Sequence, residues 1–337
     1  MQPKVGLGQE RDDLKLRQRP TSIGIVCMDL AQSLDAIFGA GHSWHSYLPT
    51  SYVKHLEASG ALVIPIWIGR DRTYYVSMMH LVNGVLLPGG AVYLDDEDKP
   101  ATDNPRLTNE CVKTIEYIYE LALERNEAGN CFPIWGICLG FQLMMKNAAR
   151  QMKRTKCGKI FNALPLELTA DYRQSKIFSG LAPELHELLE SEPFACHQHK
   201  YCITEKSLGA AADDWRVLAT RKSANDEIFI TLIEHKRFPF YGCQFHPERA
   251  AYEKLVERKD PCSKSHTETC IQLNQHFANF FVTVCGQNSN RFANEEQLAR
   301  HLISNWNPES CGEYGDVNWR EVYLFSKDVD YPKAVAN

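Results

Sequence analysis

The sequence predicts an α/β protein: a three-layer α/β/α sandwich around a mostly parallel central sheet. Short apolar runs bounded by turn residues alternate along the chain with stretches of helical periodicity. Because these runs are apolar at successive positions, we expect both faces of each strand to be covered by helices, as in parallel sheets. A chain of 337 residues, 44% hydrophobic and 23% charged, is long enough for one large domain of this kind.

The first half of the chain should supply most of the parallel sheet. In the longest expected helix, Ile115, Ile118, Tyr119 and Ala122 recur at helical spacing. In sheets of this type, ligands bind beyond the carboxyl ends of the strands. The expected strands cover residues 22–28, 61–67, 84–90 and 132–137, and the expected helices cover 51–59, roughly 105–128 and 139–151.

The second half of the chain is richer in strands and ends in an extension. We found no internal repeat, and no linker rich in Pro, Gly or Ser divides the chain. We therefore expect a polar tail at 1–20, a main domain at 21–287 and an extension at 288–337 that packs on the same domain. Strands are expected at 164–168, 217–220, 228–233, 241–245 and 321–325, and helices through Leu273, Phe277, Phe280, Phe281 and Val284 and near 295–305.

Charge and hydropathy exclude several classes of partner. The formal net charge is -5, so no global basic field draws the protein to nucleic acid or to an anionic membrane. The apolar run at 132–145 is shorter than the ~20 residues that a membrane-spanning helix needs. The first twenty residues lack the apolar core of a signal peptide, and no Asn-x-Ser/Thr glycosylation acceptor occurs. Twelve cysteines at irregular intervals leave the redox compartment undecided.

A cysteine between two glycines marks the candidate nucleophile. In Gly136-Ile-Cys138-Leu-Gly140 it follows an expected strand and precedes an expected helix. A buried cysteine is more often a small core residue than a reactive one. The order strand, Gly-x-Cys-x-Gly, helix nevertheless matches a nucleophile elbow, in which the sharp turn requires small neighbours. The helix dipole would also favour a thiolate at this position. We therefore predict that Cys138 is the nucleophile.

A thiol nucleophile needs a base, and the base needs a group that orients it. In Tyr241-Gly-Cys-Gln-Phe-His246-Pro-Glu248 an expected strand ends at the histidine. The single residue between His246 and Glu248 lets the carboxylate turn back toward the imidazole. We predict His246 as the acid/base and Glu248 as the orienting group. The amides of Leu139 and of the glycine turn at Gly89 and Gly90 are the expected oxyanion-hole donors.

The segment Cys196-His-Gln-His-Lys-Tyr-Cys202 raises the alternative of a zinc site. It holds two cysteines and two histidines within seven residues. The spacings differ from those of zinc fingers or knuckles, in which paired ligands recur at set intervals. We therefore predict no metal site and no cofactor.

These motifs resemble the class I glutamine amidotransferase superfamily, and within it the γ-glutamyl hydrolase family. The resemblance rests on Leu87-Pro-Gly-Gly90, Ser51-Tyr-Val-Lys-His-Leu-Glu-Ala-Ser-Gly60, Phe132-Pro-Ile-Trp-Gly-Ile-Cys-Leu-Gly-Phe141 and His246-Pro-Glu-Arg-Ala-Ala-Tyr-Glu253, and it runs from about residue 21 to the end. It implies a flavodoxin-like sandwich in which 21–287 is the catalytic domain. It also implies hydrolysis of γ-glutamyl amide bonds through a thioester, with folylpoly-γ-glutamates as substrates. By family pattern Tyr47, Gln142 and His199 would contact the substrate.

The resemblance leaves several questions open. Gln142 stands where some relatives have an acidic residue, and Ala251 stands where a proline is usual. A glutaminase that supplies ammonia to a separate synthetase, and a non-catalytic γ-glutamyl-binding protein, are the alternative functions. A homodimer is left open. The family implies a lysosomal, vacuolar or secreted protein, whereas this sequence shows no signal peptide.

Overall fold

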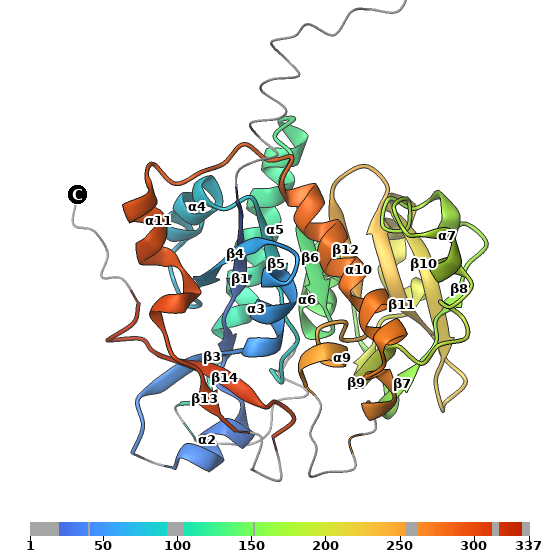
Figure 1. Cartoon of the computed structure of the whole chain (residues 1–337), viewed down its shortest axis with the longest axis horizontal. Coiled ribbons are helices and arrows are strands. Elements are labelled where there is room, and N and C mark those ends of the chain that lie inside the picture. Colours follow the sequence, from blue (N-terminus) through green and yellow to red (C-terminus); the bar gives the residue numbers. More distant parts are fainter. Residues whose placement is uncertain are drawn as a thin grey trace, which may run out of the picture.

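The computed structural model describes residues 20–39, 41–92, 104, 106–150, 152–253, 260, 262–311 and 317–331, and a large central sheet runs through its middle (Figure 1). This sheet has eight strands in the order β4-β1-β5-β6-β12-β11-β10-β8. The first five are parallel and the last three are added antiparallel. Their bounds are β4 (Ala61–Ile66), β1 (Thr21–Val26), β5 (Gly84–Leu87), β6 (Ile134–Ile137), β12 (Phe240–Cys243), β11 (Ile228–His235), β10 (Trp215–Lys222) and β8 (Glu167–Leu168).

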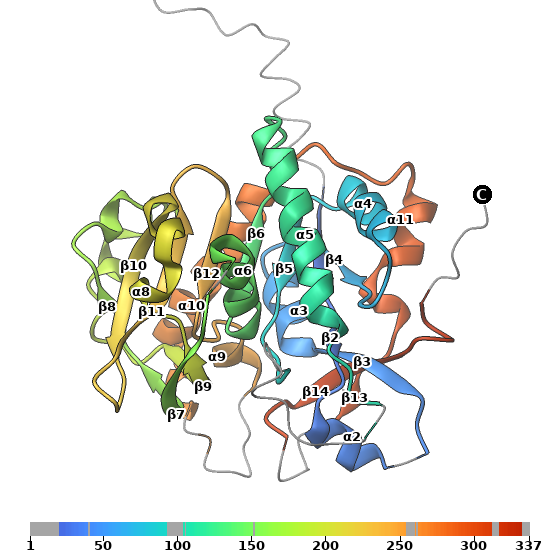
Figure 2. The ribbon, with the colours of Figure 1, turned by 180° about the vertical axis from the view of Figure 1, so that it is seen from behind.

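Helices cover both faces of this sheet. Helices α3 (Thr50–Glu57), α9 (Arg249–Tyr252) and α10 (Glu268–Cys285) lie in front of it in Figure 1. Helices α4 (Arg72–Leu81), α5 (Glu110–Glu127) and α6 (Leu139–Ala149) lie on the opposite face, which Figure 2 shows from behind. The three-layer α/β/α prediction is therefore confirmed.

Aromatic packing joins the α10 layer to the sheet. Trp135 on β6 is buried and packs edge-on against Phe277 and Phe281, with ring centroids 5.9 and 5.8 Å apart. Burying one large apolar side chain contributes about 1.5–3 kcal/mol to folding. The helix predicted from the Leu273 to Val284 periodicity is thus the element that closes this side of the core.

Two smaller sheets lie beside the main one, and the sequence did not predict their strand pairing. One has the order β13-β14-β3-β2, and the other is the antiparallel pair of β7 and β9. Strand β14 pairs with β3, which lies far away in sequence. Strand β9 has the sequence Ala-Cys-His-Gln-His-Lys-Tyr-Cys, which lacks the alternation of apolar and polar residues that predicts a strand. The bounds are β2 (Met28–Asp29), β3 (Trp44–Pro49), β7 (Thr155–Leu164), β9 (Ala195–Cys202), β13 (Glu309–Ser310) and β14 (Glu321–Ser326).

Several boundaries differ from the sequence prediction. The single strand predicted at 164–168 is wrong. Strand β7 ends at Leu164, Pro165 follows without an N–H to donate, and the two-residue strand β8 begins only at Glu167. The strand expected at 22–28 is divided between β1 and β2, which belong to different sheets. Almost all of the tail predicted at 1–20 lies outside the described residues. Further short helices are α2 (Gln32–Phe38), α7 (Pro183–His186), α8 (Glu205–Leu208), α11 (Glu295–His301) and the 3-10 helices Tyr172–Gln174, Gly209–Asp214, Ser263–Ser265 and Ile303–Asn305.

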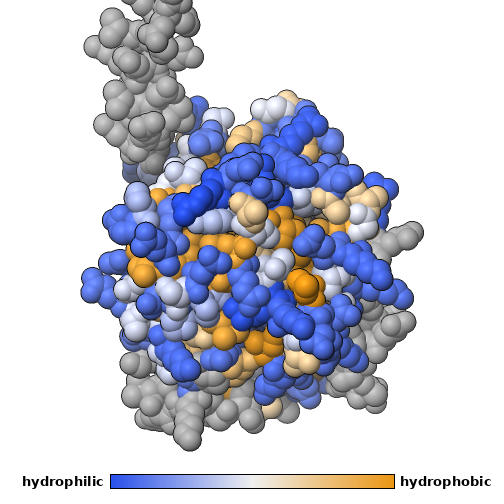
Figure 3. All heavy atoms as spheres, turned by 90° about the vertical axis from the view of Figure 1, so that its right-hand side faces the viewer, coloured by the Kyte–Doolittle hydropathy of each residue, from blue (hydrophilic) through white to orange (hydrophobic). Residues whose placement is uncertain are grey.

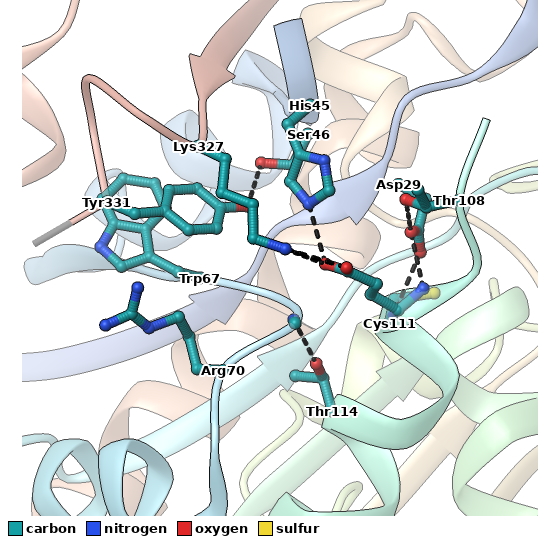
Figure 4. Close-up of polar contacts among 12 residues, drawn as sticks. Asp29, His45, Ser46, Trp67, Arg70, Thr108, Cys111, Thr114, Lys327 and Tyr331 are labelled. Atoms are coloured by element: carbon teal, nitrogen blue, oxygen red, sulfur yellow. Dashed lines mark hydrogen bonds and ion pairs between the residues drawn. The ribbon is translucent and has the colours of Figure 1, made fainter. Parts of the chain in front are cut away.

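The start of α5 is fixed by a carboxylate from another element. Asn109 offers no side-chain cap, but Asp29 on β2 accepts hydrogen bonds from the backbone N–H groups of Glu110 and Cys111 at 2.7 and 2.8 Å (Figure 4). An anionic acceptor at a helix N-terminus satisfies free amides and complements the helix dipole. The helix therefore begins at Glu110 and not near 105, where the sequence pattern alone placed it.

The C-terminal segment is tied to the main domain by aromatic and ionic contacts (Figure 4). Tyr331 stacks on Trp67, with ring centroids 5.0 Å apart, and its hydroxyl lies 2.8 Å from Ser46 Oγ. Lys327 Nζ lies 2.9 Å from Glu110 Oε1, and His45 Nε2 lies 2.8 Å from Glu110 Oε2. The hydrogen bond with His45, followed by that with Lys327, lowers the pKa of Glu110 to about 2 in spite of partial burial.

None of the helices in the described ranges is long and apolar enough to cross a bilayer. Hydrophilic side chains dominate the face seen in Figure 3, with apolar residues gathered between them.

Replacing Glu110 with glutamine should reduce stability in a pH-dependent way. Because the folded-state pKa of Glu110 is depressed, its stabilising contribution is present above the ordinary value of 4.5 and is lost as pH falls toward 2. We expect Glu110→Gln to lower the free energy of unfolding in urea by about 0.5–1 kcal/mol near neutral pH, and by less near pH 3. Glu116→Gln, in an exposed pair with Lys113, is the control. A difference that is equal at both pH values would contradict this account.

Candidate active site

Cys138 lies at a sharp turn between β6 and α6. Its backbone has φ 50° and ψ −105°, a left-handed conformation that non-glycine residues rarely adopt. A Cβ at Gly136 would come within 2.8 Å of the Phe141 nitrogen, and one at Gly140 would overlap the Leu87 carbonyl. Both flanking positions therefore require glycine, as the elbow motif predicts. The Cys138 side chain is 6% exposed.

The parallel pairing of β6 with β12 places the histidine segment beside this turn. Ile137 is paired with Cys243, and the Cys138 N–H donates to the Cys243 carbonyl at 2.8 Å. Three residues later the His246 N–H donates to the Cys196 carbonyl on β9 at 2.8 Å. Strands β12 and β9 thus fix the backbone on both sides of His246.

Cys138, His246 and Glu248 are brought together at the carboxyl end of the sheet. His246 Nδ1 lies 2.7 Å from Glu248 Oε1, and the imidazole interacts electrostatically with Cys138. Burial works against a charged imidazole, but the negative charge of Glu248, the interaction with Cys138 and the hydrogen bond to Glu248 raise the pKa of His246 to about 10. Burial likewise opposes a charged carboxylate, but His246 keeps the pKa of Glu248 below its ordinary value.

Tyr52 on α3 is a site residue that the sequence analysis did not assign. Its buried hydroxyl accepts a hydrogen bond from the Gly89 N–H at 2.9 Å and lies 3.2 Å from His246 Nδ1. It also interacts with the Glu248 carboxylate. This tyrosine therefore links the glycine turn to the histidine and glutamate pair. The sequence offered only its place next to Ser51 in a helix that resembles the family.

The three predicted oxyanion donors are placed differently from one another. The Gly89 N–H is already bonded to Tyr52, and a Cβ at this glycine would lie 2.7 Å from His246 Cε1 and 3.4 Å from Cys138 Cβ. The N–H groups of Gly90 and Leu139 make no hydrogen bond within the described part of the chain. Leu139 is the first residue of α6, where backbone amides lack intrahelical partners.

The three predicted substrate residues have different surroundings. Tyr47 on β3 is buried, interacts electrostatically with Cys138, and its hydroxyl has no partner among the described residues. The His199 ring on β9 lies 3.1 Å from His197 and 3.6 Å from Cys157, and it packs edge-on against Phe229 on β11, with ring centroids 5.5 Å apart. Gln142 on α6 donates to the Tyr201 carbonyl and to Gln244, both at 3.0 Å.

Gln244 is a second residue that the sequence analysis missed. It is fully buried between Cys243 and Phe245, and its Nε2 lies 3.5 Å from Cys138 Sγ. The Gln198 carbonyl of β9 lies 3.9 Å from the same sulfur. The position of Gln244, two residues before His246, was the only signal in the sequence, and it did not reveal where the side chain points.

The cysteine and histidine segment at 196–202 lies within β9, and its two cysteines have different partners. Cys196 is joined to Cys262 by a disulfide with a Cα–Cα distance of 5.5 Å. Cys202 contacts the Thr155 carbonyl on β7. Within the described ranges no group of three or more His, Cys, Asp or Glu side chains is arranged to hold a metal ion.

The chain is similar to several known proteins. The family model described as Peptidase C26 matches residues 22–248. Gamma-glutamyl hydrolase B of Dictyostelium discoideum is 28% identical over 92% of this chain and 84% of its own length. Gamma-glutamyl hydrolase 2 of Arabidopsis thaliana is 31% identical over 84% of this chain and 77% of its own length. A glutamine amidotransferase of Thermotoga maritima, a solved structure, has a TM-score of 0.43 at 13% identity, and the match covers 80% of this chain and 100% of that one.

The family model matches more than half of this chain, and the structure places an elbow cysteine beside a histidine and glutamate pair. This chain therefore belongs to the peptidase C26 family.

Proposed function

We propose that this hydrolase of γ-glutamyl bonds uses Cys138 as its nucleophile, His246 as its acid/base and Glu248 as the group that orients the histidine. The observation that carries the proposal is that Cys138 and His246 meet beside Gly89, where a Cβ would lie 2.7 Å from His246 Cε1 and 3.4 Å from Cys138 Cβ, while His246 Nδ1 lies 2.7 Å from Glu248 Oε1. Nucleophile, base and orienting group in hydrogen-bond reach are what covalent hydrolysis requires.

The reaction follows from these positions. The Cys138 sulfur attacks the γ-carbonyl carbon, and the oxygen that becomes negative accepts hydrogen bonds from the N–H groups of Gly90 and Leu139. His246 gives its Nε2 proton to the leaving amine as the carbon–nitrogen bond breaks, which leaves a γ-glutamyl thioester. Water then gives a proton back to His246 and attacks the thioester, so the free carboxylate and the thiolate are restored. Gly89 holds Tyr52 and packs against His246, and we assign it no oxyanion role.

The substrates that we propose are folylpoly-γ-glutamates, in which γ-glutamyl amide bonds repeat along an anionic tail. We retain Tyr47 as a substrate contact, since its buried hydroxyl has no partner in the described chain and the residue interacts electrostatically with Cys138. Gln142 and His199 are already bonded to neighbouring protein groups, so we do not include them among the contacts.

A two-substrate assay of wild type and Cys138→Ala tests this function. We expect wild type to shorten a pteroyl-poly-γ-glutamate and to release little ammonia from free glutamine. Loss of the nucleophile should lower chain shortening by about a thousandfold or more. Cys285→Ala, at a buried free cysteine in α10, is the matched control and should retain activity. Ammonia release without chain shortening would instead favour a glutaminase, and inertness toward both substrates would favour a binding protein.

Removing the charge of Glu248 should move the pH profile. The raised pKa of His246 depends on this carboxylate, so in Glu248→Gln burial should pull that pKa back toward or below the ordinary 6.5. The protonated imidazole is then lost at lower pH, and the alkaline limb of kcat/KM should shift to lower pH. The maximum should also fall by about 10²–10⁴-fold. Glu268→Gln, at an exposed carboxylate on α10, should leave the profile unchanged. An alkaline limb that coincides with wild type would contradict the assignment of Glu248.

A further inference from the structure

We propose that Gln244 donates an N–H to the Cys138 sulfur and stabilises its negative charge, and that Gln142 and Arg154 fix the direction of this donation. The inference rests on the proposed role of Cys138 as the nucleophile. It assigns Gln142 to the support of the nucleophile and not to the substrate.

The side chain of Gln244 has little freedom to move. Its own backbone N–H donates to the Thr231 carbonyl on β11 at 2.9 Å, and the residue has no exposed surface. Its amide lies between two polar neighbours, with Nε2 3.5 Å from Cys138 Sγ and Oε1 3.0 Å from Gln142 Nε2. The amide therefore bridges the nucleophile and helix α6.

The orientation of both side-chain amides follows from neighbours that can only donate or only accept a hydrogen bond. Gln142 Nε2 faces the Tyr201 carbonyl at 3.0 Å, and a carbonyl oxygen only accepts. Gln142 Oε1 faces the Arg154 guanidinium at 3.2 Å, and a guanidinium only donates. Gln142 is thus fixed at both ends, and its remaining N–H must donate to Gln244 Oε1.

This order leaves the NH₂ group of Gln244 facing the sulfur. A rotation by 180° would bring two NH₂ groups together at Gln142 and would turn a carbonyl oxygen toward Cys138. Arg154 also lies over the Tyr201 ring, 4.2 Å from its centroid, which holds the far end of the chain of bonds in place. The direction of donation therefore runs from Arg154 through Gln142 and Gln244 to the sulfur.

A donor at this position favours the charged sulfur. Hydrogen bonds to ionised acceptors are stronger than neutral ones, and burial strengthens them further. The Gln198 carbonyl, which cannot donate to the sulfur, lies farther away than Gln244 Nε2, at 3.9 Å. The titratable groups that interact with Cys138 are Tyr47 on β3, Tyr52 on α3, Cys243 on β12 and His246, and a substitution of Gln244 leaves all four in place.

Alkylation of the full-length protein by iodoacetamide tests the proposal without substrate. The sulfur displaces iodide, and the modified Cys138 peptide is quantified by mass spectrometry because other free cysteines are present. In Gln244→Met we expect the second-order rate constant near neutral pH to fall about tenfold, the scale of a lost hydrogen bond to a charged group. The pH at which alkylation is half-maximal should rise. Gln142→Met, one step farther away, should change both quantities in the same direction but by less.

A matched variant separates this effect from general loosening of the fold. Gln275 on α10 is half-buried and donates two hydrogen bonds from Nε2, to the His55 carbonyl at 3.1 Å and to Ser59 Oγ at 2.6 Å. Gln275→Met should lose stability in thermal unfolding and yet be alkylated at the wild-type rate. Gln244→Glu keeps the shape of the side chain and replaces the donor with an acceptor, so it should be alkylated still more slowly at neutral pH. Wild-type rates in the Gln244 variants, or an equal loss in Gln275→Met, would overturn the proposal.

Hydrolysis assays distinguish a failure of this inference from a failure of the proposed function. If wild type cleaves pteroyl-poly-γ-glutamate, Gln244→Met should lower kcat and leave KM within about twofold, because the donor acts on the nucleophile and not on the substrate. In the other outcome, wild type cleaves neither test substrate while the alkylation rates of the variants follow the expected order. That result would contradict the proposed function and would still support the proposed role of Gln244.

Discussion

The strained backbone of Cys138 is the constraint on which the rest of the site depends. A non-glycine residue held at positive φ costs of the order of 1–3 kcal/mol, so neighbouring structure must hold it there. The Cys138 N–H is bonded to β12, and the Gly140 N–H is bonded to the Pro88 carbonyl beyond β5. The central three strands of the sheet therefore fix the turn from both sides. The same turn leaves the Leu139 amide free of intrahelical partners at the start of α6 and places Cys138 and His246 on the same side of Gly89.

Burial strengthens the electrostatic interactions around the Cys138 sulfur. Cys138, His246 and Glu248 are each less than one tenth exposed, so their interactions are weakly screened by water. A raised pKa for His246 together with a lowered pKa for Glu248 describes an ion pair that persists at neutral pH. Tyr52 and Gln244 contact this group from α3 and from the end of β12, so the charged atoms face polar partners that come from separate elements.

Much of the fold and the centre of the site could be predicted from the sequence because both follow local rules. Apolar runs and glycine turns mark β1, β4, β5 and β6, and a Gly-x-Cys-x-Gly turn between strand and helix has few other uses. Since ligand sites of parallel sheets lie at carboxyl ends, Cys138 and His246 could be expected near each other. The start of α5 could not be predicted, because Asp29 lies 81 residues earlier in the chain. The contacts of Tyr52 and Gln244 could not be predicted for a similar reason. Each depends on which group the buried polar atoms of the side chain face in the folded protein.

The disulfide between Cys196 and Cys262 joins two residues that are 66 positions apart in the sequence. His246 and Glu248 lie within the loop that it closes, and Cys138 lies outside it. In the chain-entropy model a loop of this size contributes about 4 kcal/mol of stability. The proposed nucleophile, Cys138, needs a free thiol, whereas the disulfide that closes the loop containing His246 and Glu248 must stay oxidised. Reductant added to protect one sulfur therefore endangers the other two, and handling this protein means choosing a thiol buffer mild enough to spare the bridge.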